Sequence, residues 1–77
     1  MIDENELNFR KILALNMRVA RARKDYTQET LAELSGISFK HITKIENAKV
    51  TPNIYFVHNI AKALDVTIDE LVTEYKK

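Results

Sequence analysis

The side chains of this sequence that are best suited to chemistry are basic, and they fall in two runs. Positions 10–24 hold six lysines and arginines and no acidic residue. Positions 40–49 hold three lysines and a single acid, Glu46. Lysine and arginine donate hydrogen bonds to anions such as phosphate. The net charge is only +1 because acidic residues gather near both ends, so the sequence predicts a basic face that the near-neutral sum conceals.

Catalytic and metal-binding side chains are poorly represented. The absence of cysteine excludes thiolate metal sites, disulfides and thiol nucleophiles, and it fits a reducing cytoplasm. The histidines, His41 and His58, fall on different predicted helices with no third ligand at helical spacing. Paired carboxylates, a nucleophile with its base and a phosphate loop are also missing from the sequence. We therefore expect no enzymatic activity, no metal and no cofactor.

Length and composition indicate one all-α domain over residues 1–77. One glycine and one proline are too few turn signals for a β-sandwich or barrel, so helices with short connections are expected. A chain this short has no room for a deep small-molecule pocket. No apolar run is long enough to span a membrane, and the N-terminus is acidic where a secretion signal would be basic and then apolar. Residues 1–8 are expected to be flexible or to extend the first helix.

Apolar periodicity and capping residues predict five helices. The first spans about residues 6–24, with a basic back. Four shorter helices are expected to start at the N-caps Thr27, Ser38, Asn53 and Thr67, the last with capping-box spacing. The expected core consists of apolar side chains at helical spacing. These are Phe9, Leu13, Met17, Ala20, Leu31, Ala32, Leu34, Ile42, Ile45, Ile54, Val57, Ile60, Ala61, Leu64, Leu71 and Val72.

The connection between the second and third helices is the most informative feature. Two short helices joined by a tight turn need a small residue where their backbones approach, a glycine in the turn, and a branched apolar residue that packs back. Ala32, Gly36 and Ile42 occupy these places. Gly36 is the only glycine of the chain, and we expect it in a left-handed conformation. The pattern indicates a helix-turn-helix.

The segment around this turn resembles the phage repressor and Cro-like helix-turn-helix domains, the XRE family. That family usually runs TQ, LA, G-[VI]-S, I, I-E-x-G-K and a proline, and this chain has TQETLAELSGISFKHITKIENAKVTPN. On either side, NMRVARARKDYTQ and NIAKALDVTIDELV are also similar to the family pattern, so the resemblance covers about residues 13–72. It implies a compact five-helix, lambda-repressor-like DNA-binding domain that usually acts as a dimer on a palindromic operator.

The resemblance also assigns roles to individual residues. It places a recognition helix at residues 38–46, with Arg21 and Glu46 as an ion pair that braces it. The major groove admits one helix, and lysine can donate to guanine. The expected base-reading side chains are Ser38, Phe39, Lys40, His41 and Lys44. Phosphate contacts are expected from Thr27, Gln28, Thr43, Lys49, Thr51 and Asn53. The alternatives are a solvated face for the lysines, partly exposed packing for Phe39, a plain helix-start residue for Gln28, and simple membership of the basic face for Arg21.

Three positions depart from the family pattern. Where the family usually has glycine, this chain has Asp25, Ala48 and Asp65. Aspartate tolerates a left-handed backbone better than most residues, whereas alanine does not. We therefore expect the helix ends near Ala48 to be remodelled.

Together these observations favour a transcriptional regulator that binds double-stranded DNA, as a homodimer whose copies lie about 34 Å apart on the duplex. The dimer surface is expected on the fifth helix, with contributions from Tyr55 or Phe56, although core packing is an equal alternative for each candidate. The candidates on and after the fifth helix are Leu71, Val72 and Tyr75. The alternative function is a protein-interaction module on the same fold, such as an antitoxin or a coactivator-like protein.

Overall fold

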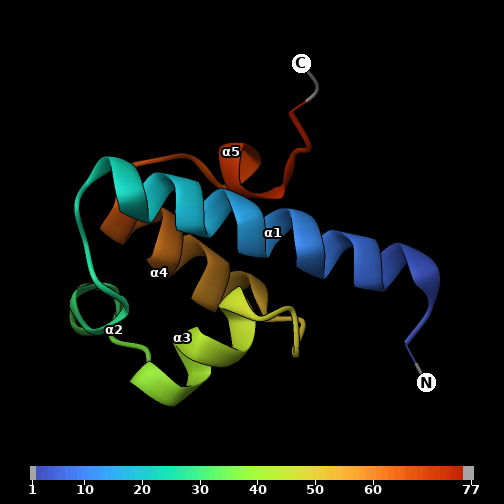
Figure 1. Ribbon diagram of the computed structural model, residues 1–77, viewed down its shortest axis with the longest axis horizontal. Coiled ribbons are helices and arrows are strands. Elements are labelled where there is room, and N and C mark those ends of the chain that lie inside the picture. The colour runs from blue at the N-terminus through green and yellow to red at the C-terminus, as the bar shows by residue number, and fades with distance from the viewer. Residues whose placement is uncertain (1, 76–77) are drawn as a thin grey trace.

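The computed structural model describes residues 2–75, which form five α-helices and no strand (Figure 1). The expected all-α, five-helix fold is confirmed. Met1, Lys76 and Lys77, which the expected domain includes, lie outside the described residues. The helices are α1 (Glu4–Arg23), α2 (Gln28–Ser35), α3 (Phe39–Glu46), α4 (Ile54–Leu64) and α5 (Ile68–Val72).

The four shorter helices begin at the expected caps. Thr27, Ser38, Asn53 and Thr67 each accept a hydrogen bond from the backbone N–H three residues further on, and Thr67 forms the expected capping box. Each cap satisfies a backbone donor that has no partner within its helix. The first helix starts earlier than expected, because Asp3 caps it by accepting from an amide at 2.7 Å. Between residues 4 and 8 the chain therefore extends α1.

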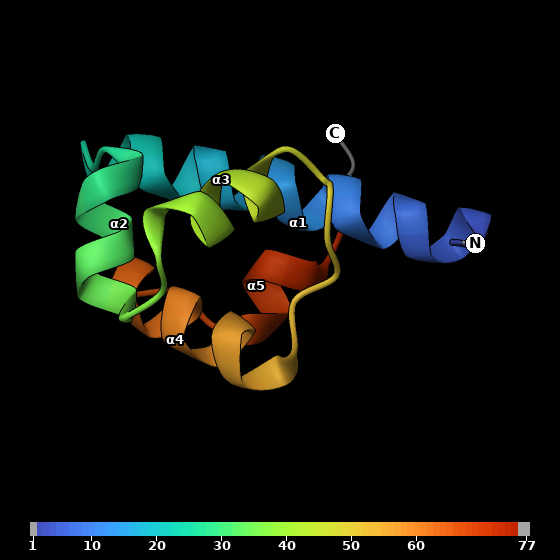
Figure 2. The same cartoon turned by 90° about the horizontal axis from the view of Figure 1, so that it is seen from below.

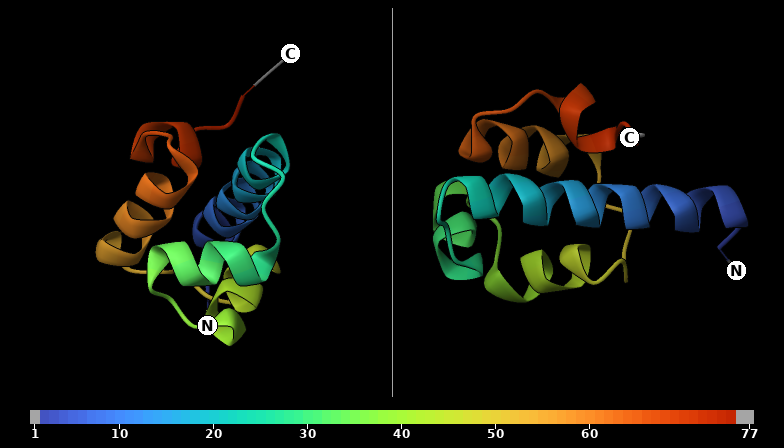
Figure 3. Two further views of the ribbon diagram at one scale, coloured as in Figure 1. Left: turned by 90° about the vertical axis from the view of Figure 1, so that its left-hand side faces the viewer. Right: turned by 45° about the horizontal axis from the view of Figure 1, so that its top comes forward.

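The long helix α1 lies in the middle of the molecule. In Figure 1 and in the right-hand view of Figure 3, α5 lies on one side of α1 and α3 lies on the opposite side. Helix α2 lies at one end of this arrangement, where it packs against α3 and α4. The described residues span 31 × 29 × 18 Å. None of the described helices is long and apolar enough to cross a membrane.

Side chains from all five helices form one core. Two expected core residues are wrong: Leu34 is 55% exposed and Ile54 is 69% exposed. Helix α2 instead packs through the face that carries Leu31 and the polar Ser35, which is buried. Ile54 is the first residue of α4 and lies before the buried stripe of that helix. The buried core consists of Leu13, Met17, Ala20, Leu31, Ile37, Ile42, Ile45, Val57, Ile60, Ala61, Leu64 and Leu71.

The helix ends at the three unusual positions are left-handed. Asp25, Ala48 and Asp65 all have φ of 57°, close to the 72° of Gly36. The expected remodelling near Ala48 is therefore wrong. The N–H of Ala48 donates to a carbonyl three residues back at 3.1 Å, and the next N–H donates five residues back at 2.9 Å. These two bonds form the usual helix-end motif, and they offset the strain that a left-handed alanine carries.

Candidate nucleic-acid interface

Helix α3 presents one polar face to solvent and one apolar face to the core. Ile42 and Ile45 are at most 1% exposed and fix the helix from within. Lys40 and Lys44 are exposed one turn apart, and side chains four residues apart share a helix face. In Figure 2 the whole of α3 lies toward the viewer, on the same side of the molecule as the loop that follows it. The outward face therefore carries positive charge on a rigid element.

The start of α3 adds two further open side chains. Ser38 is exposed and caps the helix, and Phe39 is 48% exposed beside it. Side chains at this end of a docked helix reach base edges. Together with the two lysines, these residues form the most accessible part of the expected base-reading set.

Two other expected contacts of α3 are already engaged within the protein. The His41 ring is half-buried and packs edge-on against Phe56, with the ring centroids 5.0 Å apart. The Thr43 hydroxyl donates to the carbonyl of Phe39 at 3.0 Å, inside its own helix. His41, expected to read bases, and Thr43, expected to contact phosphate, are thus less available than the exposed lysines.

A buried carboxylate fixes the end of α3. Glu46 is only 2% exposed, and its two oxygens accept from Nε and Nη2 of Arg21, both at 3.0 Å. The remaining Nη1 of Arg21 donates to the carbonyl of Tyr26 at 3.0 Å. A bidentate guanidinium–carboxylate pair fixes orientation as well as distance. The structure thus brings the two expected brace residues together and ties them to the connection between α1 and α2.

Two more side chains hold Glu46, and sequence reasoning missed both. The Gln28 amide, expected at a phosphate, donates to Oε1 of Glu46 at 3.1 Å. Arg18 Nη1 donates to the backbone carbonyl of Glu46 at 3.0 Å. Every residue has a main-chain carbonyl, so residue types cannot indicate which carbonyl accepts a hydrogen bond. The sequence therefore identified Arg18 only as one of the positive charges in the basic run. Gln28 keeps a second amide hydrogen for another acceptor.

The remaining expected phosphate contacts fall on two sides of α3. Thr27 lies at the start of α2, where its hydroxyl caps the helix and bonds to Thr30 at 3.0 Å. Residues 47–53 form the loop between α3 and α4 on the other side (Figure 2). Lys49 and Asn53 of this loop are exposed. The Thr51 hydroxyl, also expected at a phosphate, accepts from Arg10 and donates to Glu6 within the protein.

The turn between α2 and α3 has the expected construction. Ile42 is fully buried, and Ala32 packs against the core from the facing helix. Gly36 ends α2 with its N–H donating to the carbonyl of Ala32 at 3.0 Å. A Cβ on Gly36 would meet no atom within 4 Å, so glycine is favoured there by its left-handed backbone conformation rather than by space.

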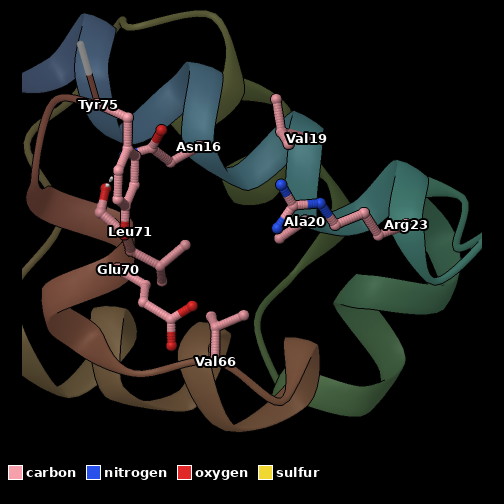
Figure 4. Close-up of a pocket in the computed structure, with 8 residues that line it drawn as sticks. All are labelled: Asn16, Val19, Ala20, Arg23, Val66, Glu70, Leu71 and Tyr75. Carbon is pink, nitrogen blue, oxygen red and sulfur yellow. Dashed lines mark hydrogen bonds between the residues drawn. The ribbon is translucent and has the colours of Figure 1, made fainter. Parts of the chain in front are cut away.

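The side of α1 opposite α3 carries an open hollow whose lining is partly polar and partly apolar (Figure 4). The walls come from α1 and from the C-terminal segment, including Val19, Leu71 and the exposed Tyr75. Leu71 is 1% exposed, which matches core packing, the equal alternative to a dimer contact. Asn16 of α1 donates to the backbone carbonyls of Leu71 and Thr73 at the end of α5, both at 2.9 Å. Among residues 2–75 no three potential ligands gather into a metal site.

Comparisons with known proteins agree with this arrangement. A helix-turn-helix family model matches residues 17–71. An uncharacterized HTH-type transcriptional regulator of Sinorhizobium fredii, y4dJ, is 31% identical over 67 residues, which are 87% of each chain. The crystal structure of a hypothetical transcription factor from Neisseria, NHTF, superposes with a TM-score of 0.83 at 29% identity, over 88% of this chain and 78% of the other. The restriction-modification controller protein C.AhdI of Aeromonas hydrophila gives 0.78 at 29% identity, over 80% and 94%.

Proposed function

Because this chain belongs to the XRE-type helix-turn-helix family of DNA-binding transcriptional regulators, we propose that it acts as a homodimer on a palindromic operator, with residues 38–46 in the major groove. Its relatives are regulators, and the chain is a DNA-binding protein and not an enzyme. In this proposal residues 1–77 form a single domain, and each copy occupies one half-site.

The observation that carries the proposal is the rigid presentation of α3. Its apolar side is buried in the core, and its end is tied to α1 and α2 through Glu46. Lys40 and Lys44 therefore project from a helix that cannot easily tilt. Preorganised donors on a rigid element make better base contacts than mobile ones, because less conformational entropy is lost on binding.

The proposed contacts divide into two groups. Ser38, Phe39, Lys40 and Lys44 read base edges, with His41 limited by its contact with Phe56. Phosphate contacts flank α3 on both sides and set the register without reading sequence. They come from Thr27, Gln28, Thr43, Lys49, Thr51 and Asn53, together with the free backbone N–H groups at the start of α2.

The size of the molecule supports two copies side by side. Recognition helices that enter successive major grooves lie about 34 Å apart, and the described residues span at most 31 Å. The molecule is thus slightly shorter than this spacing, so two copies fit side by side on one face of a duplex without overlapping. Tyr55 on α4 is 65% exposed next to the loop and offers an apolar contact for the second copy.

Selection of bound duplexes from a random pool tests this function. The full chain should enrich a motif with two inverted half-sites, and Lys44→Ala should relax the preference at one position in each half. The expected cost is about 1 to 3 kcal/mol per contact, because a base-reading donor is lost.

Lys62→Ala is the matched control, since Lys62 is an exposed lysine on α4 rather than on α3. It should keep the wild-type motif. A uniform loss over all sequences would make Lys44 a phosphate contact, and enrichment of a single half-site would contradict the dimer. Absence of any enriched duplex would overturn the proposal that the chain binds an operator, and it would favour the protein-interaction module.

A further inference from the structure

A cluster of polar side chains joins the start of α1 to the loop that follows α3. Arg10 Nε donates to the Thr51 hydroxyl at 2.7 Å, and Arg10 Nη1 donates to the carbonyl of Lys49 at 3.2 Å. Arg10 Nη2 lies 3.5 Å from a carboxylate oxygen of Glu6, which also accepts from Thr51. One guanidinium and one hydroxyl thus hold a carboxylate at the edge of the loop.

The α1 half of the cluster lies outside the part of the chain that the family model matches. The helix-turn-helix match covers residues 17–71, and both Glu6 and Arg10 precede it on the extended α1. The proposed DNA contacts therefore do not include them. Their partners Lys49 and Thr51, in contrast, lie on the loop beside α3 (Figure 2).

We propose that Arg10 and Thr51 form a seat for a backbone phosphate of the bound duplex, and that Glu6 occupies this seat in the free protein. This inference rests on the proposed function. A guanidinium and a hydroxyl suit the two charged oxygens of a phosphodiester in the same way as they suit a carboxylate. The carboxylate of Glu6 marks the position at which an anion is bound.

The exchange is physically reasonable because the internal ion pair is open to solvent. The Glu6 side chain is 42% exposed and that of Arg10 is 19% exposed. Exposed pairs of this kind contribute little to stability. A phosphate that takes the seat gains from the release of counterions, whereas Glu6 in place would repel the approaching backbone. The charge of Glu6 therefore opposes binding of the duplex.

Binding of the selected duplex by Glu6→Gln tests the seat. At about 0.1 M salt we expect the dissociation constant of this variant to fall about three- to tenfold, because Arg10 then meets the phosphate without competition. The slope of log K against log salt should steepen by about 0.9 for each copy bound. Adding Arg10→Gln to Glu6→Gln should reverse both changes.

Glu4→Gln is the matched control, since Glu4 is an exposed acid in the first turn of the same helix and has no place in the cluster. A gain in Glu4→Gln equal to that in Glu6→Gln would overturn the seat and indicate a general charge effect. Unchanged or weaker binding by Glu6→Gln would also overturn it and leave Arg10 as a brace for the loop.

A second readout needs no duplex and so separates this inference from the proposed function. Inorganic phosphate titrated into the full-length Glu6→Gln variant should shift the Arg10 Nε–H resonance, and the wild-type protein should respond at higher phosphate concentrations. Absence of a shift in the variant would overturn the seat even if the protein binds its operator. A shift without any duplex affinity would keep Arg10 and Thr51 as an anion site but overturn both the proposed function and the assignment of this site to DNA.

Discussion

The two sides of α1 hold their neighbours by different means. Toward α3 and its loop, α1 sends Arg10, Arg18 and Arg21, and all three donate to named oxygens of other elements. Toward α5, α1 contributes the apolar Val19 and Ala20 together with two polar residues, Asn16 and the exposed Arg23, and of these two Asn16 donates hydrogen bonds to the C-terminal segment. One side is directional and charged, and the other depends mainly on burial.

The difference follows from what each side has to position. Apolar contacts favour burial, but they tolerate small sliding motions because they are not directional. Hydrogen bonds to a buried carboxylate fix both distance and orientation. The hydrogen bonds on the side of α1 that faces α3 therefore fix the position and orientation of α3. On the other side, α5 needs only to cover the core.

The largest expected effect is the loss of the brace. Arg21→Met should lower the free energy of unfolding by about 2 to 3 kcal/mol, because Glu46 is left buried with only Gln28 as a side-chain partner. Urea unfolding measures this loss. DNA affinity, measured at a temperature where the variant is folded, should fall as well.

Arg23→Met is the control for that change, because Arg23 is an exposed arginine at the end of the same helix. Its effect on stability should stay within about 0.5 kcal/mol. If Arg21→Met left DNA affinity intact, the charged side of α1 would serve stability alone, and the comparison between the two sides would fail.

A smaller effect is expected on the opposite side. Asn16→Ala removes two hydrogen bonds to the C-terminal segment and should cost about 1 to 2 kcal/mol. Unfolding by urea again measures the change, with the exposed Asn8→Ala as the control. Operator affinity should be unchanged, since α5 and α3 lie on opposite sides of α1. A loss of affinity larger than the loss of stability would contradict this separation.

The smallest effects are gains at the left-handed helix ends. Ala48→Gly should stabilise by about 1 kcal/mol, because glycine adopts positive φ without strain. Asp25→Gly and Asp65→Gly should each gain a few tenths of that, about 0.3 to 0.8 kcal/mol, since aspartate tolerates the conformation better. The Asp65→Gly variant also loses the exposed ion pair between Asp65 and Lys24, which contributes little to stability. The melting temperatures of the three variants test this ranking. A melting temperature of Ala48→Gly below that of the wild-type protein would show that the helix end at Ala48 is not strained.

Most of the fold could be predicted from the sequence because its signals are local. The caps Thr27, Ser38, Asn53 and Thr67 act on an amide three residues away, and the turn at Gly36 depends on one backbone conformation. The errors in the expected core arose where the local sequence pattern does not show which side chains are buried. Periodicity could not tell that Leu34 and Ile54 lie beyond the packed faces.

The candidate site could be predicted only in outline. Exposure of Lys40 and Lys44 follows from the burial of Ile42 and Ile45 on the opposite face of α3. The hydrogen bond from Gln28 to Glu46 could not be predicted from the sequence, because the acceptor lies eighteen residues away on another helix.

The sequence by itself therefore determined where the four shorter helices begin and which face of α3 is free, since hydrogen bonds and periodicity within a few residues decide these features. Only the tertiary structure decided which partners the polar side chains find. Arg10 meets Thr51 across forty-one positions, and Arg21 meets Glu46 across twenty-five. Such contacts depend on how helices pack against one another, and packing is a property of the whole core rather than of any segment.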